Sequence, residues 1–247
     1  MYQATTRSSV YRDAVRASSR DLPEWLVPFS IVGAPLLERI ASELRVRKGD
    51  AFLDLGCGAG GPGLWVAART GASLIGIDFS VTAIEAAASL AEARKLAERA
   101  RFIVADATAT GLPDASVCAV MSVDTLMFMD AERAANEIGR VLMPGGVLVM
   151  TAAESLVEPF LPTLVRDYRP FFERAGFRTI CHEAPEGHAE RQLALYRALE
   201  DRAEALRAEI GAAAEALLEE ARNGLSRAAQ QTTRTRPVLF VAERLAE

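Results

Sequence analysis

Between residues 50 and 153, short apolar runs alternate with longer amphipathic segments. The apolar runs lie at 50–55, 73–78, 100–106, 116–124 and 146–153. Runs of this length bounded by turn residues are typical of buried strands. The segments 81–99 and 131–142 have the apolar spacing of helices, and the second one stops at a Pro-Gly-Gly turn. This alternation predicts an α/β fold of Rossmann-like type, with a parallel, doubly wound sheet.

After residue 153 the pattern changes. A helix is predicted over 163–177, ending at Gly176, and a strand over 177–184. The segment 188–230 predicts one amphipathic helix or a pair of helices, because apolar residues share one stripe at Leu195, Leu199, Leu206, Ile210 and Leu217. A final strand at 236–245 follows, and we expect it to pair antiparallel near the edge of the sheet.

The chain is therefore predicted to be a single domain with two additions. A helical N-terminal cap covers residues 1–48 and includes a helical stretch at 31–44. The core spans 49–186, and a helical insertion at 187–233 precedes the last strand at 234–247. The insertion is expected to act as a lid over a substrate or as a dimer face, so a homodimer is a possible assembly.

Composition and charge narrow the range of partners. The 247 residues are 50% hydrophobic and carry a formal net charge of −5, with no basic patch, which argues against a nucleic-acid partner. The three cysteines lie far apart and suggest reduced thiols rather than disulfides or a metal site. No apolar run reaches membrane-spanning length and no signal peptide is evident, so we expect a cytoplasmic protein that does not enter a membrane.

The stretch that follows the first predicted strand has the chemistry of a ligand-binding loop. Gly56, Cys57, Gly58 and Gly60 satisfy the pattern G-x-G-x-x-G, whose glycines allow backbone to approach a ligand closely. Asp78 ends the second predicted strand, where a carboxylate can accept hydrogen bonds from both hydroxyls of a ribose. Dinucleotide sites and S-adenosylmethionine (SAM) sites share both features, so they do not separate the two cofactors.

Two further carboxylates favour SAM. Asp54 lies just before the glycines, where it would repel a pyrophosphate and attract the cationic methionine part of SAM. Asp106 ends the third predicted strand and can accept a hydrogen bond from an adenine amino group. The alternative is structural: Asp54 would cap amides of the loop, and Asp106 would cap a turn.

Taken in order, the motifs resemble those of the small-molecule branch of class I SAM-dependent methyltransferases. The resemblance covers about residues 48–153 and rests on LDLGCGAGG (53–61), GIDFS (76–80), ADAT (105–108), AVMSVD (119–124) and RVLMPGG (140–146). It implies a seven-stranded sheet with an antiparallel last strand and SAM as cofactor. Together with the loop chemistry, it predicts these cofactor-binding residues: Asp54, Gly56, Cys57, Gly58, Gly60, Asp78, Phe79, Ser80, Asp106, Ala107, Ser122 and, from the N-terminal cap, Tyr11.

The catalytic candidates are few. Asp124 follows the fourth predicted strand, at the edge where an acceptor must meet the methyl group, and it would orient or deprotonate that acceptor. The alternative is that Asp124 caps a helix at 125–129. His188 starts the insertion and would reach the site if the insertion is a lid, whereas His182 lies in a predicted edge strand and is expected to be structural. No metal site is predicted.

The function expected first is methyl transfer to a small-molecule acceptor, in particular a bacterial secondary metabolite. The apolar residues 126–129 suggest a mostly apolar acceptor, and the attacked atom (O, N or C) stays open. The alternatives are an RNA or protein methyltransferase, a non-catalytic SAM-binding protein, and an NAD-linked oxidoreductase. The acidic charge argues against RNA, and Asp54 argues against NAD.

Overall fold

The computed structural model describes residue 5 and residues 7–246. Its contacts divide the chain into two compact units. One is a sheet unit made of Pro35–Pro185 and Thr235–Glu247, and the other is a helical unit made of Met1–Ala34 and Glu186–Arg234. Within the described residues, no helix is both long and apolar enough to cross a membrane.

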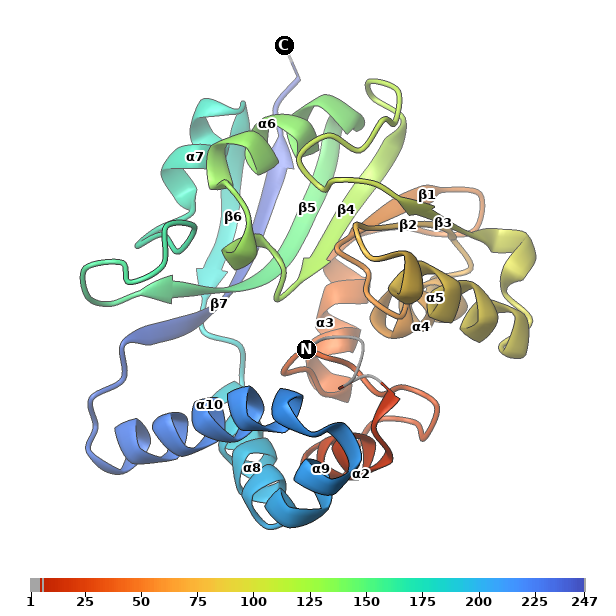
Figure 1. Ribbon diagram of the computed structural model, residues 1–247. Helices are drawn as coiled ribbons and strands as arrows, with labels where there is room; N and C mark the ends of the chain where they lie inside the picture. Colours follow the sequence, from red (N-terminus) through yellow and green to blue (C-terminus); the bar gives the residue numbers. More distant parts are fainter. Residues whose placement is uncertain (1–4, 6, 247) are drawn as a thin grey trace. The chain divides into compact units, whose positions relative to one another are not determined.

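The sheet unit is built on seven strands in the order β3-β2-β1-β4-β5-β7-β6 (Figure 1). Their bounds are Ala51–Leu55 (β1), Ser73–Asp78 (β2), Ala100–Val104 (β3), Val117–Val123 (β4), Leu142–Ser155 (β5), Phe177–Glu183 (β6) and Thr235–Arg244 (β7). Strands β1 to β5 pair in parallel, and β7 lies antiparallel between β5 and β6. The predicted sheet with an antiparallel last strand is confirmed. Because the chain order reverses between β1 and β4, a ligand is expected beyond the carboxyl ends of these two strands.

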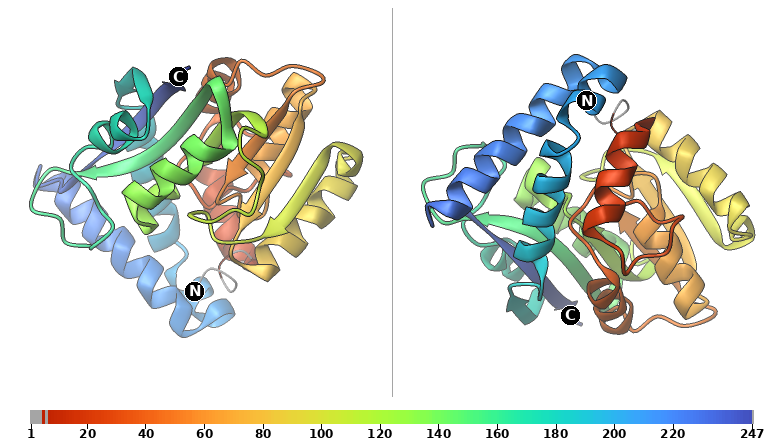
Figure 2. Two further views of the ribbon diagram at one scale, coloured as in Figure 1. Left: turned by 90° about the horizontal axis from the view of Figure 1, so that it is seen from above. Right: turned by 90° about the horizontal axis from the view of Figure 1, so that it is seen from below.

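Helices cover both faces of this sheet. In Figures 1 and 2, α3, α4 and α5 lie on one face, and α6 and α7 lie on the other. Their bounds are Ala34–Glu43 (α3), Gly61–Thr70 (α4), Val81–Ala93 (α5), Ala131–Val141 (α6) and Arg169–Arg174 (α7), with short 3-10 turns at Ala97–Arg99 (η1) and Leu126–Phe128 (η2). Side-chain caps explain two of the helix starts, because Ser80 accepts from the Ala83 amide and Asp130 from the Arg133 amide.

Part of the core of the sheet unit lies between α6 and α7 and the strands β5, β6 and β7. The ring of Phe172 lies 5.4 Å from that of Phe177 and 5.2 Å from that of Phe240, and all three side chains are buried. Aromatic pairs at this separation add to the stability gained from burial alone. The three rings therefore join α7 to β6 and β7.

The predicted helix over 163–177 is largely wrong, because only the six residues of α7 are helical. Pro170 lies in the first turn, where it lacks an N–H to donate and its ring excludes a helical turn before it. The carboxylate of Asp167 accepts from the Arg169 amide instead. Residues 156–168, between β5 and α7, therefore form a loop without helix or strand.

The helical unit joins two distant parts of the chain. Helix α2 (Ser9–Ser18) packs with α8 (His188–Glu200) and α9 (Ala203–Ile210), and α10 (Ala212–Ala229) packs with α8 and α9. Figure 2 shows α2 beside α8. The predicted apolar stripe faces the core of the helical unit, since Leu195, Leu199, Leu206 and Leu217 are buried and Ile210 is partly buried. The expectation of one or two helices in this segment is wrong: there are three described helices. Gly211, with φ 57° and ψ −132°, ends α9 before α10 starts.

The N-terminal segment does not behave as one cap. Helix α3 lies within the predicted stretch 31–44 but belongs to the sheet unit, apart from its first residue, whereas α2 belongs to the helical unit. Residues 1–4 and 6 of the predicted cap lie outside the described residues.

Candidate cofactor and acceptor site

The loop after β1 turns back onto β2 through its backbone. The amides of Gly56 and Cys57 both donate to the Ile77 carbonyl, at 2.8 and 2.9 Å. Gly56, Gly58 and Gly60 have φ values of 74°, 53° and 78°. This left-handed region is open to glycine at little cost and is unfavourable for other residues. The three predicted loop glycines are thus required by the backbone itself.

Two glycines also make room for side chains. A Cβ on Gly56 would lie 2.1 Å from Cγ2 of Thr125, and a Cβ on Gly63 would lie 2.4 Å from Oδ2 of Asp54. The Thr125 hydroxyl donates to the Gly56 carbonyl at 3.3 Å. Sequence reasoning did not identify Thr125, because its contact with Gly56 joins residues 69 positions apart in the chain.

Asp54 is the unusual group of the site. Its side chain is 2% exposed, and Oδ2 has no hydrogen-bond partner among the described residues. Burial, and then the nearby charge of Asp78, raise the pKa of Asp54 to about 7. A second negative charge here would be disfavoured further, whereas a cation would compensate the buried carboxylate.

Asp78 ties the loop to the end of β2. Its Oδ2 accepts from the Gly58 amide and its Oδ1 from the Ser80 amide, both at 2.9 Å. Each oxygen keeps a second lone pair, so the carboxylate can still receive the two hydroxyls of a ribose. Phe79, the residue between Asp78 and Ser80 in the chain, is 83% exposed, and its ring is available to cover an adenine.

Cys57 is an inert part of the loop. Its thiol is buried and lies against Gly76, where an added Cβ would be 3.0 Å from Sγ. Burial first, then Asp54 and Asp78, raise the pKa of Cys57 well above its usual range. The contribution of this side chain is therefore packing beneath the loop rather than nucleophilic chemistry.

Asp106 lies in the exposed loop after β3. Its Oδ1 accepts from the Thr108 amide at 2.7 Å and from the Thr108 hydroxyl at 2.9 Å, and these bonds lower its pKa. The turn-capping role that the sequence left open is thus present. It also fixes a charged carboxylate beside Ala107, the position expected to face an adenine edge.

At the end of β4, Ser122 and Asp124 use their polar atoms differently. Ser122 is fully buried and donates to the Leu55 carbonyl at 2.9 Å, so its hydroxyl joins β4 to β1. Asp124 has a left-handed φ of 53°. Its amide donates to the carbonyl of Thr151 at 2.9 Å and to its hydroxyl at 3.1 Å, and that hydroxyl donates to Oδ1 of Asp124 at 2.7 Å. Thr125, not Asp124, occupies the N-cap position of η2.

Two predicted site residues belong to the helical unit instead. Tyr11 is 5% exposed in the core of that unit, and its ring lies 5.8 Å from that of Phe29. His188 is the first residue of α8, directly after Gly187 in a left-handed conformation. The other predicted residues all lie in the sheet unit, at the carboxyl edge of β1, β2, β3 and β4.

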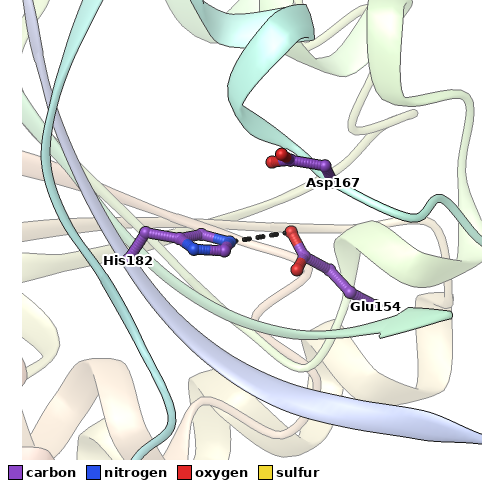
Figure 3. Close-up of side chains that lie close together, drawn as sticks. All are labelled: Glu154, Asp167 and His182. Carbon is purple, nitrogen blue, oxygen red and sulfur yellow. Dashed lines mark hydrogen bonds and ion pairs between the residues drawn. The ribbon is translucent and has the colours of Figure 1, made fainter. Parts of the chain in front are cut away.

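A separate polar cluster joins the ends of β5, β6 and β7 (Figure 3). Glu154, Asp167 and His182 each offer one potential metal-ligand atom, and these three atoms lie within 4.8 Å of one another. Among the described residues, this is the one group of side chains that could hold a metal ion. Fully buried Glu154 accepts from the Tyr168 amide at 2.9 Å and from Arg236 at 2.8 and 3.0 Å, and it lies 2.9 Å from Nε2 of His182. Because N–H donors occupy both carboxylate oxygens of Glu154, we interpret the cluster as a structural ion-pair network.

The neighbouring Tyr168 offers a test of buried polar packing. Its side chain is fully buried and its hydroxyl has no partner among the described residues. We expect Tyr168→Phe to keep or raise the free energy of unfolding, by up to about 1 kcal/mol, because the variant removes an unsatisfied group. Urea denaturation measures this change.

The matched control is Tyr196→Phe. The Tyr196 hydroxyl accepts from Gln192 at 3.0 Å and donates to Glu220 at 3.2 Å. Removing a bonded hydroxyl should cost about 1 kcal/mol. A Tyr168→Phe variant that loses as much as the control would mean that the Tyr168 hydroxyl has a partner.

The strand order, the left-handed glycine loop and the carboxylates at successive strand ends are those of the class I methyltransferase fold. Residues 53–150 match the family model described as a methyltransferase domain. This core of the chain is therefore similar to the methyltransferase-domain family.

Individual relatives agree with this assignment. The chain is 35% identical over 116 residues to 27-O-demethylrifamycin SV methyltransferase of Amycolatopsis mediterranei, covering 47% of this chain and 43% of that protein. It spans less than half the length of the first curated relatives that it matches. The activity of the whole protein therefore does not follow from these matches.

Two solved structures share the fold at low identity. The [4+2]-cyclase SpnF superposes with a TM-score of 0.74 at 23% identity, over 86% of this chain and 82% of that one. Phosphoethanolamine N-methyltransferase 2 of Haemonchus contortus, solved with SAM, gives a TM-score of 0.76 at 19% identity, over the whole of this chain and 60% of that one.

Proposed function

We propose that this protein binds SAM and transfers its methyl group to a small, mostly apolar acceptor. The observation that carries the proposal is the buried, unpartnered Oδ2 of Asp54 behind a left-handed glycine loop. A pyrophosphate would place further negative charge beside this carboxylate, whereas the cationic amino-acid part of SAM would compensate it.

The remaining residues fit the other parts of the cofactor. Asp78 has lone pairs for the ribose, and Asp106 with Ala107 lies where an adenine edge is expected. When bound, SAM supplies an activated methyl group, so the chain has only to hold the acceptor in line and exclude water. A relative in Haemonchus contortus has been solved with SAM, which supports this cofactor.

The acceptor is expected at the ends of β4 and β5. Asp124 would orient the acceptor or take its proton, and Thr151 would hold the carboxylate of Asp124 in place. Phe128 in η2 is 69% exposed, and the loop after β5 adds exposed Phe160 and Leu161. This apolar surface favours an apolar acceptor such as a bacterial secondary metabolite. The similarity to 27-O-demethylrifamycin SV methyltransferase supports this class of acceptor.

Calorimetry with SAM, with its demethylated product S-adenosylhomocysteine and with NADH tests the cofactor. We expect micromolar binding of the first two and none of NADH. Turnover is then tested with methyl-labelled SAM and a panel of apolar phenols and amines. Tight NADH binding without SAM binding would overturn the proposal. SAM binding with no label transferred would favour the non-methylating alternative, since the same fold occurs in a protein named as a cyclase.

The role of Thr151 gives a prediction with a conservative partner variant. Thr151→Val removes the hydroxyl that donates to Asp124, so we expect kcat with the best acceptor of that panel to fall about tenfold, with SAM affinity unchanged. Thr151→Ser should restore most of kcat. Equal turnover of both Thr151 variants and the wild type would exclude Thr151 from the mechanism. Full turnover of Asp124→Asn would exclude Asp124 from the mechanism.

A further inference from the structure

The loop that carries Asp106 and Ala107 depends on contacts outside itself for its shape. Between β3 and β4, residues 105–116 form no helix and no strand, apart from an isolated bridge between Asp106 and Ala109. Thr110 lies in the middle of this loop and is nevertheless only 3% exposed. Something in the sheet unit therefore holds the middle of the loop.

That anchor is Glu137 on α6. Its Oε1 accepts from the amide of Thr110 at 2.7 Å and from its hydroxyl at 2.5 Å. The Thr110 hydroxyl in turn accepts from the Leu112 amide at 3.2 Å. One carboxylate oxygen thereby holds both hydrogen-bond donors of Thr110, and the bond from the Leu112 amide extends this hold to the next turn of the loop.

Arg140, one turn along α6, completes the contact. It donates to Glu137 from Nε at 2.9 Å and from Nη2 at 2.7 Å. Its Nη1 donates to the Leu112 carbonyl at 2.7 Å and to the Asp114 carboxylate at 2.6 Å. The loop is thus fastened to α6 at Thr110, Leu112 and Asp114.

Charge keeps this anchor in place. Glu137 is 8% exposed, and its bonds, first of all those from Arg140, lower its pKa to about 2. The carboxylate is therefore charged at every pH at which the protein is expected to work. A buried carboxylate with four N–H and O–H donors holds its geometry far more firmly than an exposed loop side chain does.

We propose that Glu137 is a positioning residue for the cofactor's base: through Thr110 it sets the loop so that Asp106 and Ala107 meet the amino edge of adenine. Glu137 itself does not contact the cofactor in this proposal. The inference rests on the proposed SAM binding. It adds that a residue of α6, outside the binding loop, determines the selectivity for adenine.

The test compares two ligands that differ only at that edge. S-adenosylhomocysteine carries the adenine amino group, whereas S-inosylhomocysteine has an oxygen in its place. We expect the wild-type protein to prefer the adenine ligand at least tenfold in calorimetric Kd. Glu137→Gln should lower this preference at least fivefold, mainly by weakening S-adenosylhomocysteine. Merely lower stability would weaken both ligands by the same factor and leave the preference unchanged.

Two controls keep the result decisive. Glu132→Gln makes the same change at an exposed position of α6 and should behave as the wild type. Thr110→Val tests the contact from the loop side and replaces Glu137→Gln if that variant does not fold. Preference retained by a folded Glu137→Gln or Thr110→Val variant, or absent in the wild type, would overturn the inference. Failure of the wild type to bind S-adenosylhomocysteine at all would instead overturn the proposed function.

Discussion

Replacing Gly56 by alanine is expected to weaken SAM binding by roughly 100-fold or more. Two costs combine at this position. The φ of 74° is unfavourable for any residue with a Cβ, by about 1 kcal/mol. In addition, the new Cβ would lie 2.1 Å from Cγ2 and 2.7 Å from Oγ1 of Thr125, so the loop and the end of β4 must move apart. The loop that would hold the methionine part of SAM is then displaced.

A second glycine separates these two costs. Gly145, near the start of β5, has a similar φ of 76°, but a Cβ there meets nothing within 4 Å. Gly145→Ala should therefore lose about 1 kcal/mol of stability and keep its affinity for SAM. Calorimetry with SAM and urea denaturation of both variants provide the comparison. Equal affinities in the two alanine variants would mean that the contact between Gly56 and Thr125 has no part in the site.

This contact illustrates how far the sequence alone could go. The glycines were predictable, because their spacing after an apolar run is a local signal. Thr125 was not, because its contact with Gly56 joins residues 69 positions apart and exists only once β1 and β4 lie side by side. For the same reason Glu137 was missed: its partner Thr110 lies 27 positions away, and a glutamate in an amphipathic helix carries no mark of burial.

The predictions of helices and strands likewise succeeded where the signal is local in the sequence and failed where it depends on distant contacts. The strands were predictable from short apolar runs, and the antiparallel last strand from the resemblance. The short α7 was not, since the apolar spacing of 163–177 outweighed the restriction that Pro170 imposes. Packing of α2 with α8 could not be predicted either, because a helical stripe shows that a face is buried but not against which segment.

Replacing Asp54 by asparagine is expected to stabilise the free protein above neutral pH and to weaken SAM binding. The pKa of Asp54 is raised from 3.8 to about 7, so the folded protein binds this proton more tightly than the unfolded chain does. Its contribution to the free energy of unfolding therefore falls as the pH rises from about 4 to about 7, and stays low above that. Asparagine lacks this term, so the variant should be more stable at pH 8, by a few kcal/mol at most.

Binding should change in the opposite sense. A cationic group beside Asp54 favours its ionised form, so wild-type affinity for SAM should rise between pH 5.5 and pH 8 as the proton leaves. The Asp54→Asn variant has no charge to offer, and its affinity should be independent of pH and about 100-fold weaker at pH 8. Asp201→Asn, which changes an exposed aspartate after α8, should match the wild type in both measurements.

The two measurements together identify what the buried carboxylate is for. A structural cap would make Asp54→Asn neutral or destabilising, with equal effects on free and SAM-bound protein. If Asp54 instead serves to bind a cation, its unpartnered Oδ2 costs free energy only while the site is empty. The Asp54→Asn variant is then more stable than the wild type and binds SAM more weakly. Calorimetry at pH 5.5, 7 and 8.5, with urea denaturation at the same values, distinguishes these outcomes. Equal affinity of wild type and variant at pH 8 would exclude Asp54 from cofactor recognition.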